Sequence, residues 1–206
     1  AVVGRIKTGK STLINALLNE NILPTAIDVC THILTFVQYG PIGPAEVIYK
    51  DLSTKLVDQS ELKALNESDS ENIRRIVVNS NNHIVEKNDL VFIDTPGDDV
   101  ENELDDKVRA AGVEYADGVM FILAKKSPNE VEKKLLRTVL EKRKKVIVIL
   151  NKIDEYFDNS TDYSNGLANV NSLKDEINAT IDHISAGVNL PPKVQLEIIS
   201  AHRIME

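Results

Sequence analysis

A short segment near the start of the chain has the composition and spacing of a phosphate-binding loop. Residues 4–11, Gly-Arg-Ile-Lys-Thr-Gly-Lys-Ser, follow the pattern G-x-x-x-x-G-K-[ST]. Gly4 and Gly9 permit a tight turn in which successive backbone N–H groups point toward one anion. In such a loop Lys10 reaches the β- and γ-phosphates of a nucleotide, and the Ser11 hydroxyl ligates Mg²⁺. The alternative is a glycine-rich turn that arose by chance.

The flanking residues supply the context that this motif requires. Ala1–Val3 are apolar, as at the end of a buried strand, and 11–19 has the spacing of a helix. One face of that helix carries Leu13, Ala16 and Leu17. A helix that begins at the loop adds unpaired N–H groups and its dipole to the anion site. The sequence therefore predicts nucleotide binding.

A second polar cluster, Asp94-Thr95-Pro96-Gly97, follows an apolar run that predicts a strand. An aspartate at the end of such a strand holds Mg²⁺ in phosphate-loop proteins, often through water. Gly97 has no side chain in the way, so its backbone N–H can donate to a γ-phosphate. The tetrapeptide alone is a common turn, but its place after the phosphate loop strengthens the interpretation.

A third cluster, Asn151-Lys152-Ile153-Asp154, also follows an apolar run. The Asp154 carboxylate only accepts hydrogen bonds, and guanine presents two adjacent donors where adenine presents none. This pairing favours guanine, because adenine would leave the carboxylate unpaired. The Lys152 stem can lie along the base, and Asn151 can tie this loop to the phosphate loop. An ordinary strand-to-helix turn with exposed charge is the alternative.

These clusters must be positioned by the elements that the remaining sequence predicts. Strands are expected at 32–39, 46–49, 73–78, 90–93, 118–124, 146–150 and 194–199. The first two, separated by the turn at 40–44, are expected to form a hairpin. The loop at 19–31 and the polar segment at 157–171 are expected to be irregular.

Helices are expected at 11–19, at 60–65 with Ser60 as its cap, and in a segment that ends at Tyr115. Ser127, Pro128 and Glu130 fit the N-cap, N1 and N3 positions of a further helix, whose inner stripe would be Val131, Leu135 and Val139. Ser172 is expected to cap a last helix. Its apolar side carries Leu173, Ile177, Ile181 and Ile184.

The alternation of strands and helices predicts an α/β fold, a three-layer doubly wound and mostly parallel sheet. In such sheets ligands bind at the carboxyl ends of the strands, where all three clusters are placed. At 42% hydrophobic and 4% aromatic with no Trp, the core must be aliphatic. The formal charge of −8 argues against binding of nucleic acid or an anionic membrane by bulk charge.

The single cysteine, Cys30, excludes an internal disulfide and suits a reducing compartment. No signal peptide or membrane-length apolar run is visible. The expected location is therefore cytoplasmic, with a peripheral position at the inner face of the membrane as the alternative. The first residues and the last ones, 202–206, lack the strand start and closing helix expected at domain ends. The chain is interpreted as a single domain, 1–206, truncated at both ends.

Taken together, the sequence resembles the phosphate-loop GTPases, and most closely the dynamin superfamily and its bacterial dynamin-like members. The resemblance rests on 4–12, the LINALL segment at 13–18, Leu23-Pro24-Thr25, Thr31, Tyr39-Gly40, and the clusters at 94–97, 151–154 and 200–201. A small Ras-type domain needs only a hairpin between Thr31 and Asp94. The extra length predicts an inserted hairpin and helix region at roughly 41–89.

The resemblance implies binding of GTP and GDP with Mg²⁺. Mg²⁺ ligands would be Ser11, Thr31 and Asp94. Thr31 would be the switch threonine, whose hydroxyl ligates Mg²⁺ and whose carbonyl holds the attacking water when GTP is bound, with Thr25 and Thr35 as rivals for this role. Catalytic roles would fall to Lys7, Lys10, Thr31 and Gly97. Ser200-Ala201 would place a backbone N–H near the guanine carbonyl. The implied nucleotide contacts are Gly4, Lys7, Thr8, Gly9, Lys10, Ser11, Thr12, Asp94, Gly97, Asn151, Lys152, Asp154, Ser200 and Ala201.

Two residues depart from the pattern of dynamins proper. Lys7 stands where those proteins carry a serine that helps bind a monovalent cation. We hypothesise that its ammonium supplies positive charge near the β–γ bridge, where charge develops in the transition state; the alternative is a solvent-exposed side chain. Asp98 stands where Ras-type enzymes place a water-orienting Gln, which implies slow hydrolysis by the isolated domain.

The expected function is GTP binding and hydrolysis by a dynamin-like domain, coupled to self-association across the nucleotide face. Membrane remodelling or assembly would involve regions outside this chain, and no nucleic-acid partner is expected. Three alternatives remain at this point: a GTP-gated switch in RNA or ribosome maturation, a nucleotide-binding scaffold with little hydrolysis, and an ATPase, which Asp154 disfavours.

Overall fold

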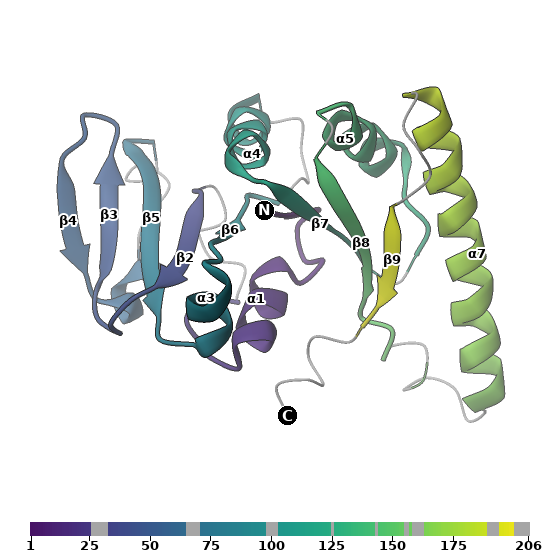
Figure 1. Ribbon diagram of the computed structural model, residues 1–206, viewed down its shortest axis with the longest axis horizontal. Helices are drawn as coiled ribbons and strands as arrows, with labels where there is room; N and C mark the ends of the chain where they lie inside the picture. Colours follow the sequence, from purple (N-terminus) through teal and green to yellow (C-terminus); the bar gives the residue numbers. More distant parts are fainter. Residues whose placement is uncertain are drawn as a thin grey trace.

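A computed structural model describes residues 1–25, 33–64, 71–97, 103–124, 126–142, 144–154, 157, 163–188 and 194–199. Within these residues nine strands form one sheet in the order β4-β3-β5-β2-β6-β1-β7-β8-β9 (Figure 1). The strands are β1 (Val2–Gly4), β2 (Thr35–Tyr39), β3 (Ala45–Tyr49), β4 (Thr54–Val57), β5 (Ile73–Ser80), β6 (Phe92–Asp94), β7 (Gly118–Ala124), β8 (Lys145–Asn151) and β9 (Gln195–Ile198). The helices are α1 (Lys10–Leu18), the 3₁₀ helix η2 (Gln59–Ala64), α3 (His83–Asn88), α4 (Glu103–Tyr115), α5 (Glu130–Glu141) and α7 (Tyr163–Gly187).

The expected α/β fold with a mostly parallel sheet is confirmed. Strands β6, β1, β7, β8 and β9 run parallel to one another, β6 pairs antiparallel with β2, and β7 pairs with β8 along its whole length. The interior strands β1, β7 and most of β8 are apolar runs, as expected where helices cover both faces of a sheet, whereas β9 at the edge alternates polar and apolar residues. The parallel arrangement brings the carboxyl ends of β1, β6 and β8 to one edge of the sheet, which is where the polar clusters follow.

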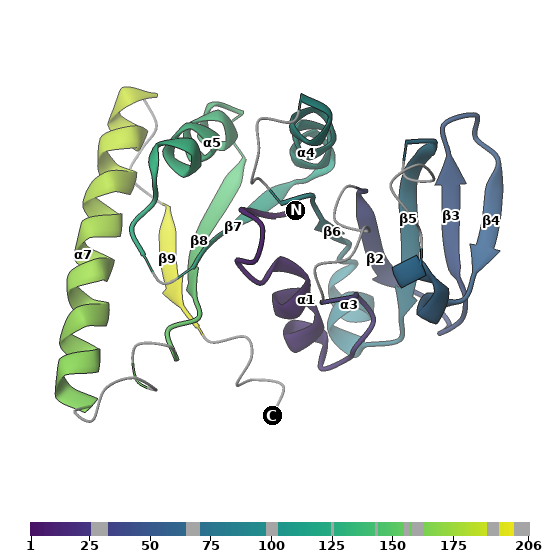
Figure 2. The ribbon, with the colours of Figure 1, turned by 180° about the vertical axis from the view of Figure 1, so that it is seen from behind.

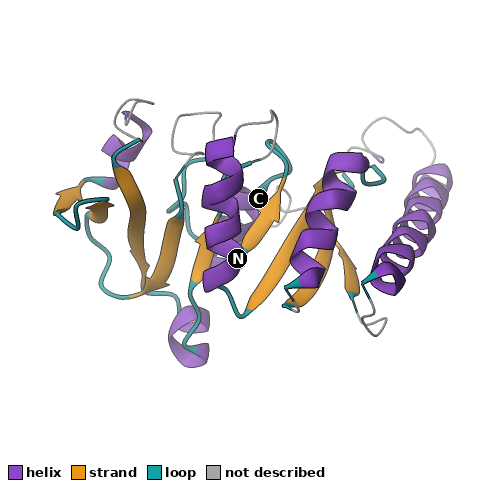
Figure 3. Cartoon of the chain, turned by 90° about the horizontal axis from the view of Figure 1, so that it is seen from above, coloured by secondary structure: helices purple, strands orange, loops and turns teal. Residues whose placement is uncertain are grey.

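Two apolar cores lie on opposite faces of the sheet. One joins α1 and α3 to the sheet through residues such as Leu13, Val85 and Val37. The other joins α4, α5 and α7 to the opposite face through residues such as Val113 and Leu136. Figures 1 and 2 show α4 and α5 above the strands and α1 and α3 below them. Seen from above, α4, α5 and α7 follow one another along the sheet, from its middle to the end that carries β9 (Figure 3).

The expected hairpin between β2 and β3 is wrong. β5 lies between them, parallel to β2 and antiparallel to β3, and the actual hairpin joins β3 to β4. The turn at 40–44 is present, but a local turn signal does not determine which strand becomes the neighbour. Long-range packing decides it, and Ile76 and Val78 of β5 are nearly inaccessible to solvent in this interior position.

The inserted region holds further elements that the sequence did not predict. β4 and α3 were not expected, and β5 continues to Ser80. The residue that caps η2 is Asp58 and not Ser60. Asp58 Oδ1 accepts from the Ser60 N–H and from the Ser60 hydroxyl. Leu90 and Val91 precede β6 and are substantially exposed, so the buried strand is shorter than expected.

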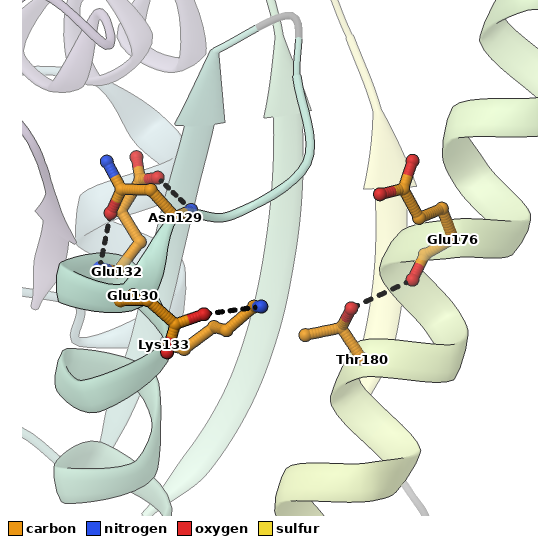
Figure 4. Close-up of polar contacts among 6 residues, drawn as sticks. All are labelled: Asn129, Glu130, Glu132, Lys133, Glu176 and Thr180. Carbon is orange, nitrogen blue, oxygen red and sulfur yellow. Dashed lines mark hydrogen bonds and ion pairs between the residues drawn. The ribbon is translucent and has the colours of Figure 1, made fainter.

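The N-cap of α5 is Asn129 and not Ser127 (Figure 4). Asn129 Oδ1 accepts from the backbone N–H of Glu132, and Glu132 Oε2 accepts from the backbone N–H of Asn129, each at 2.9 Å. The helix therefore starts later than expected, and its buried face differs from the expected stripe of Val131, Leu135 and Val139. Val131 is 52% exposed. The buried apolar residues of α5 are Leu136, Val139 and Leu140.

The last helix is longer than expected, because α7 begins at Tyr163 and absorbs much of the segment assigned to a polar loop. One side of α7 meets the core, and among its described residues the exposed side is mostly polar, with Leu167 as an exposed apolar residue. The apolar stripe itself is confirmed: Leu173, Ile177, Ile181 and Ile184 are all buried. Within the described part of the chain, no helix has the length and apolar character needed to span a bilayer.

Replacing Asn129 with Ala is expected to lower the free energy of unfolding by about 1 kcal/mol, because the substitution removes an N-cap acceptor. For a domain of this size this corresponds to a fall of about 2–4 °C in Tm. Thermal denaturation followed by circular dichroism measures it. Thr138→Val, which removes a hydroxyl bond to Lys134 O on the exposed side of the same helix, is the control. An Asn129→Ala variant as stable as wild type would contradict the assigned cap.

Candidate functional site

The segment 4–11, called the phosphate loop from here on, links the end of β1 to the first turn of α1. Its two glycines are required by close contacts. A Cβ on Gly4 would lie 2.5 Å from the Ile122 carbonyl oxygen, and one on Gly9 would lie 2.5 Å from Asn151 Nδ2. Gly9 also has φ 92°, a left-handed conformation that costs glycine little. The loop is therefore shaped by contacts from β7 and from the end of β8.

Hydrogen bonds to its own carbonyls hold the phosphate loop in a compact turn. Lys10 Nζ donates to Gly4 O at 3.1 Å and to Arg5 O at 3.0 Å, and Thr8 Oγ1 donates to Arg5 O at 2.8 Å. The Lys10 side chain thus folds back from the first turn of α1, and its ammonium lies against the end of β1 and the start of the loop. Positive charge and helix N–H groups together favour a bound phosphate.

Lys7 is the second residue of this loop with a positive φ, 61°. A non-glycine residue in this region is uncommon and is strained relative to an ordinary turn. The loop conformation imposes this strain, so Lys7 is held at the turn between the two glycines. Strain at a loop of this composition is typical of ligand sites.

Ser11 and Asp94 meet where α1 begins and β6 ends. The Ser11 hydroxyl donates to Asp94 Oδ2 at 2.5 Å. The other carboxylate oxygen, Oδ1, is buried and has no hydrogen-bond partner in the described residues. Burial raises the pKa of Asp94 above its ordinary value of 3.8, against the opposing influence of Lys10 and of the Ser11 bond. The structure thus holds an incompletely satisfied carboxylate beside a hydroxyl.

This pair fits a magnesium ion. Mg²⁺ takes oxygen ligands, commonly one or two protein groups with the rest from phosphates and water. The buried Asp94 Oδ1 offers a free lone pair, and the Ser11 hydroxyl is within hydrogen-bond distance of the same carboxylate. A cation here would also offset the cost of burying the negative charge. The residues present therefore match the group that the motif implies.

The loop 94–97 lies directly on the phosphate loop. A Cβ on Gly97 would be 2.7 Å from Ile6 Cα and 2.8 Å from Ile6 N. Any larger residue at 97 would therefore push the two backbones apart. Thr95 adds a buried hydrogen bond of 2.8 Å from its hydroxyl to Val2 O in β1. The backbone of Gly97 is consequently fixed beside the turn that would hold the terminal phosphate.

The segment 151–154, called the guanine loop from here on, is tied to the phosphate loop as the sequence predicted. Asn151 Nδ2 donates to Thr8 O at 2.9 Å, and Asn151 Oδ1 accepts from the backbone N–H of Lys152 at 2.8 Å. Asn151 is 2% exposed, so both bonds are shielded from water. Lys152 adopts φ 62°, which turns the chain sharply before Asp154.

Some residues singled out by the sequence lie outside the described part of the chain. These are Cys30, Thr31, Asp98, Ser200 and Ala201. Of the rivals for the switch threonine, Thr25 is exposed, whereas Thr35 lies in β2 opposite Asp94.

Sequence reasoning missed two buried polar residues next to the site. Asn15, fully buried in α1, donates to Leu23 O and accepts from Leu23 N at 2.8 and 3.0 Å. Thr95 was read only as part of a turn. The signal for Asn15 was a polar residue inside the apolar LINALL segment. For Thr95 there was no local signal, because its partner is in another strand.

The chain matches the model of the dynamin family over residues 1–153. It belongs to the dynamin family. Because the matched region contains the phosphate loop, the 94–97 loop and most of the guanine loop, the chain is a dynamin-like GTPase domain. This membership favours the dynamin-type interpretation over a GTPase of RNA maturation.

The chain is also similar to individual proteins. An uncharacterized protein in the xynA 3′ region of Caldicellulosiruptor sp. (strain Rt8B.4) is 31% identical over 159 residues, 74% of this chain and 39% of that protein. The transmembrane GTPase Marf of Drosophila melanogaster is 31% identical over 157 residues, 73% of this chain and 19% of that protein. The chain thus spans less than half the length of either relative.

A solved structure described as an oligomerised bacterial dynamin pair shares the fold. It superimposes with a TM-score of 0.68 at 19% identity, over 99% of this chain and 39% of that chain. The similarity extends across the inserted strands as well as the central sheet. At this identity the comparison concerns the fold alone.

Replacing Asp94 with Asn is expected to stabilise the chain when nucleotide and Mg²⁺ are absent. Because burial raises the pKa of Asp94 above 3.8, the folded chain keeps a proton that the unfolded chain releases. The free energy of unfolding therefore falls as pH rises from about 3.8 through the raised pKa. At pH 7.5 the Tm of the variant should therefore exceed that of wild type, by about 2–4 °C for each kcal/mol gained in the free energy of unfolding.

Thermal denaturation of both proteins between pH 3.5 and 8 provides the measurement, and the gap in Tm should close at the acidic end. Asp51→Asn is the control, because hydrogen bonds from Ser53 lower the pKa of that exposed carboxyl. Equal Tm values for wild type and Asp94→Asn at neutral pH would show that the buried Asp94 carboxylate does not lower the stability of the folded chain.

Proposed function

We propose that this chain binds GTP with Mg²⁺ and hydrolyses it to GDP and phosphate as the catalytic domain of a dynamin-like protein. The observation that supports this is the convergence of three loops at one edge of the sheet. The Ser11–Asp94 bond joins the phosphate loop to the end of β6, and the Asn151–Thr8 bond joins it to the guanine loop. A nucleotide needs all three, for its phosphates, metal and base.

The phosphate loop would hold the triphosphate through backbone N–H groups and Lys10, the first residue of α1. The wider set of phosphate contacts would be Gly4, Lys7, Thr8, Gly9, Ser11 and Thr12. Ser11, Asp94 and Thr31 would ligate Mg²⁺, which when bound neutralises charge on the β- and γ-phosphates. The Gly97 N–H would donate to the γ-phosphate, and Thr31 O would orient the attacking water.

The base would be selected by Asp154. Its carboxylate accepts from the ring N–H and amino group of guanine, while adenine offers no such pair. The Lys152 stem would lie along the base, and Asn151 would keep the guanine loop in register with the phosphate loop. Ser200 and Ala201 would complete the pocket near the guanine carbonyl.

We further propose that domains pair across the nucleotide face and that other parts of the protein carry membranes or assembly. Membership of the dynamin family supports this, as does a fold neighbour described as an oligomerised bacterial dynamin pair that tethers membranes. The whole domain, 1–206 with its insertion at roughly 41–89, would act as one unit in this pairing.

GTP turnover per molecule as protein concentration rises tests the proposal, with ATP as control substrate. With GTP as substrate, we expect specific activity to rise with protein concentration, because pairing of two domains completes the site. We expect no hydrolysis of ATP. Asp154→Ala should lower the affinity for GTP by about 100-fold or more, as expected when buried donors of the base lose their acceptor. Equal use of GTP and ATP would contradict the assignment of Asp154, and absence of turnover at any concentration would leave a scaffold role.

Lys7→Ala is expected to reduce kcat at saturating GTP by about 10²–10³-fold, the effect of removing one electrostatic donor from a transition state. Affinity for GDP should change little, because the charge acts on the β–γ bridge. Lys7→Arg keeps the charge and should retain most of the activity. Lys50→Ala, at an exposed position after β3, is the control. Unchanged turnover in Lys7→Ala would show that the side chain serves only the loop conformation.

A further inference from the structure

Thr95 is the one residue of the 94–97 loop whose side chain reaches the neighbouring strand in the described structure. Its hydroxyl donates to Val2 O at 2.8 Å, and its side chain is 4% exposed. Val2 lies in β1, whose last residue, Gly4, begins the phosphate loop. The bond therefore links the residue after Asp94 to the strand that leads into the phosphate loop.

The pairing of β1 with β6 is short, which makes this hydroxyl bond important. The described register between the two strands contains a single pair, Val2 with Asp94. Beyond Asp94 the backbone leaves the sheet, so the Thr95 hydroxyl is the next link that holds the departing chain against β1. Without it, Val2 O would lose a buried partner, at a cost comparable to any unmade buried hydrogen bond.

The methyl group of Thr95 is restrained from the other side by α4. A Cβ on Gly112 would lie 2.9 Å from Thr95 Cγ2 and 2.8 Å from Leu34 Cδ2. The glycine thus lets the backbone of α4 pack directly on Thr95. The side chain is held between β1 and α4, and both of its functional groups are used.

We propose that Thr95 is a positioning residue that sets where Asp94 and Gly97 stand relative to the phosphate loop. This inference rests on the proposed function, since it concerns the Mg²⁺ and γ-phosphate side of that site. Asp94 precedes Thr95 and meets Ser11, and Gly97 follows and lies against Ile6. A shift of the loop away from β1 would open both contacts together.

The consequence is selective for the triphosphate. GDP has no γ-phosphate to meet Gly97 and depends mainly on the phosphate loop and the guanine loop. GTP with Mg²⁺ needs Asp94 and Gly97 in place as well. Loosening of the 94–97 loop therefore weakens GTP binding more than GDP binding and raises the Mg²⁺ concentration that GTP requires. A purely structural role would lower the melting temperature without changing this preference.

The test compares nucleotide affinities of wild type, Thr95→Val and Thr95→Ser. Thr95→Val keeps the shape and the methyl contact but removes the hydroxyl, and Thr95→Ser keeps the hydroxyl. Fluorescent GDP and a non-hydrolysable GTP analogue are titrated over a series of Mg²⁺ concentrations, and Tm is measured alongside. We expect Thr95→Val to lower the preference for the analogue over GDP by about three- to tenfold, the effect of one buried hydrogen bond. Thr95→Ser should stay within about twofold of wild type on the same grounds.

Two further variants separate positioning from stability. Asn129→Ala lowers stability through the N-cap of α5, where the Asn129 side chain and N–H both bond to Glu132 within the same helix (Figure 4), and it should leave the preference unchanged. Gly112→Ala displaces the Thr95 methyl from the α4 side and should lower the preference in the same direction, so the idea stays testable if Thr95→Val does not fold.

The outcomes are distinct. A Thr95→Val variant with the wild-type preference and Mg²⁺ requirement would overturn the role of Thr95 while leaving the proposed function intact. The same loss of preference in Asn129→Ala would also overturn it, because the effect would then follow stability alone. A wild-type chain that binds neither nucleotide would overturn the proposed function, and this inference with it.

Discussion

The contact between Ser11 and Asp94 is the constraint on which the rest of the site depends. It places a buried carboxylate, one oxygen of which has no described partner, at the start of α1 and close enough to Lys10 to be influenced by its charge. An arrangement of this kind costs stability in the nucleotide-free chain, because burial disfavours the ionised form. The surrounding structure must therefore be rigid enough to keep the carboxylate where a cation can use it.

That rigidity comes from side-chain bonds between separate elements as well as from the bonds within the phosphate loop. Thr95 holds the end of β6 to β1, Asn151 holds the end of β8 to Thr8, and Asn15 holds α1 to Leu23. Each of these side chains is buried, so each bond is shielded from competing water. The close approaches at Gly4, Gly9 and Gly97 leave no room for a side chain that would relax the packing. The loops are thus shaped by their neighbours.

The sequence predicted which loops meet at the site better than it predicted the order of the strands. Motifs such as the phosphate loop encode their function in local spacing, and the elements around them follow from apolar runs. The hairpin at the turn 40–44 failed because strand order is decided by long-range burial: the alternating pattern of β5 fits between β2 and β3. For α5, Ser127 and Asn129 each have a Glu three residues later, so two overlapping capping boxes compete. Only the packed structure selects Asn129.

The inserted strands extend the sheet without disturbing the site. They add to β2, at the edge opposite the guanine loop, and they are tied to the far end of α1. Asn82 Nδ2 donates to Leu18 O, and the Ser80 hydroxyl donates to Glu20. The helix that follows the phosphate loop is therefore anchored at its C-terminus by the insertion. Leu13, Ile14 and Leu18 are buried along the same helix, so α1 is fixed by packing along its length as well as by these bonds at its end. The insertion thus supports the site from a distance, through the helix that follows the phosphate loop.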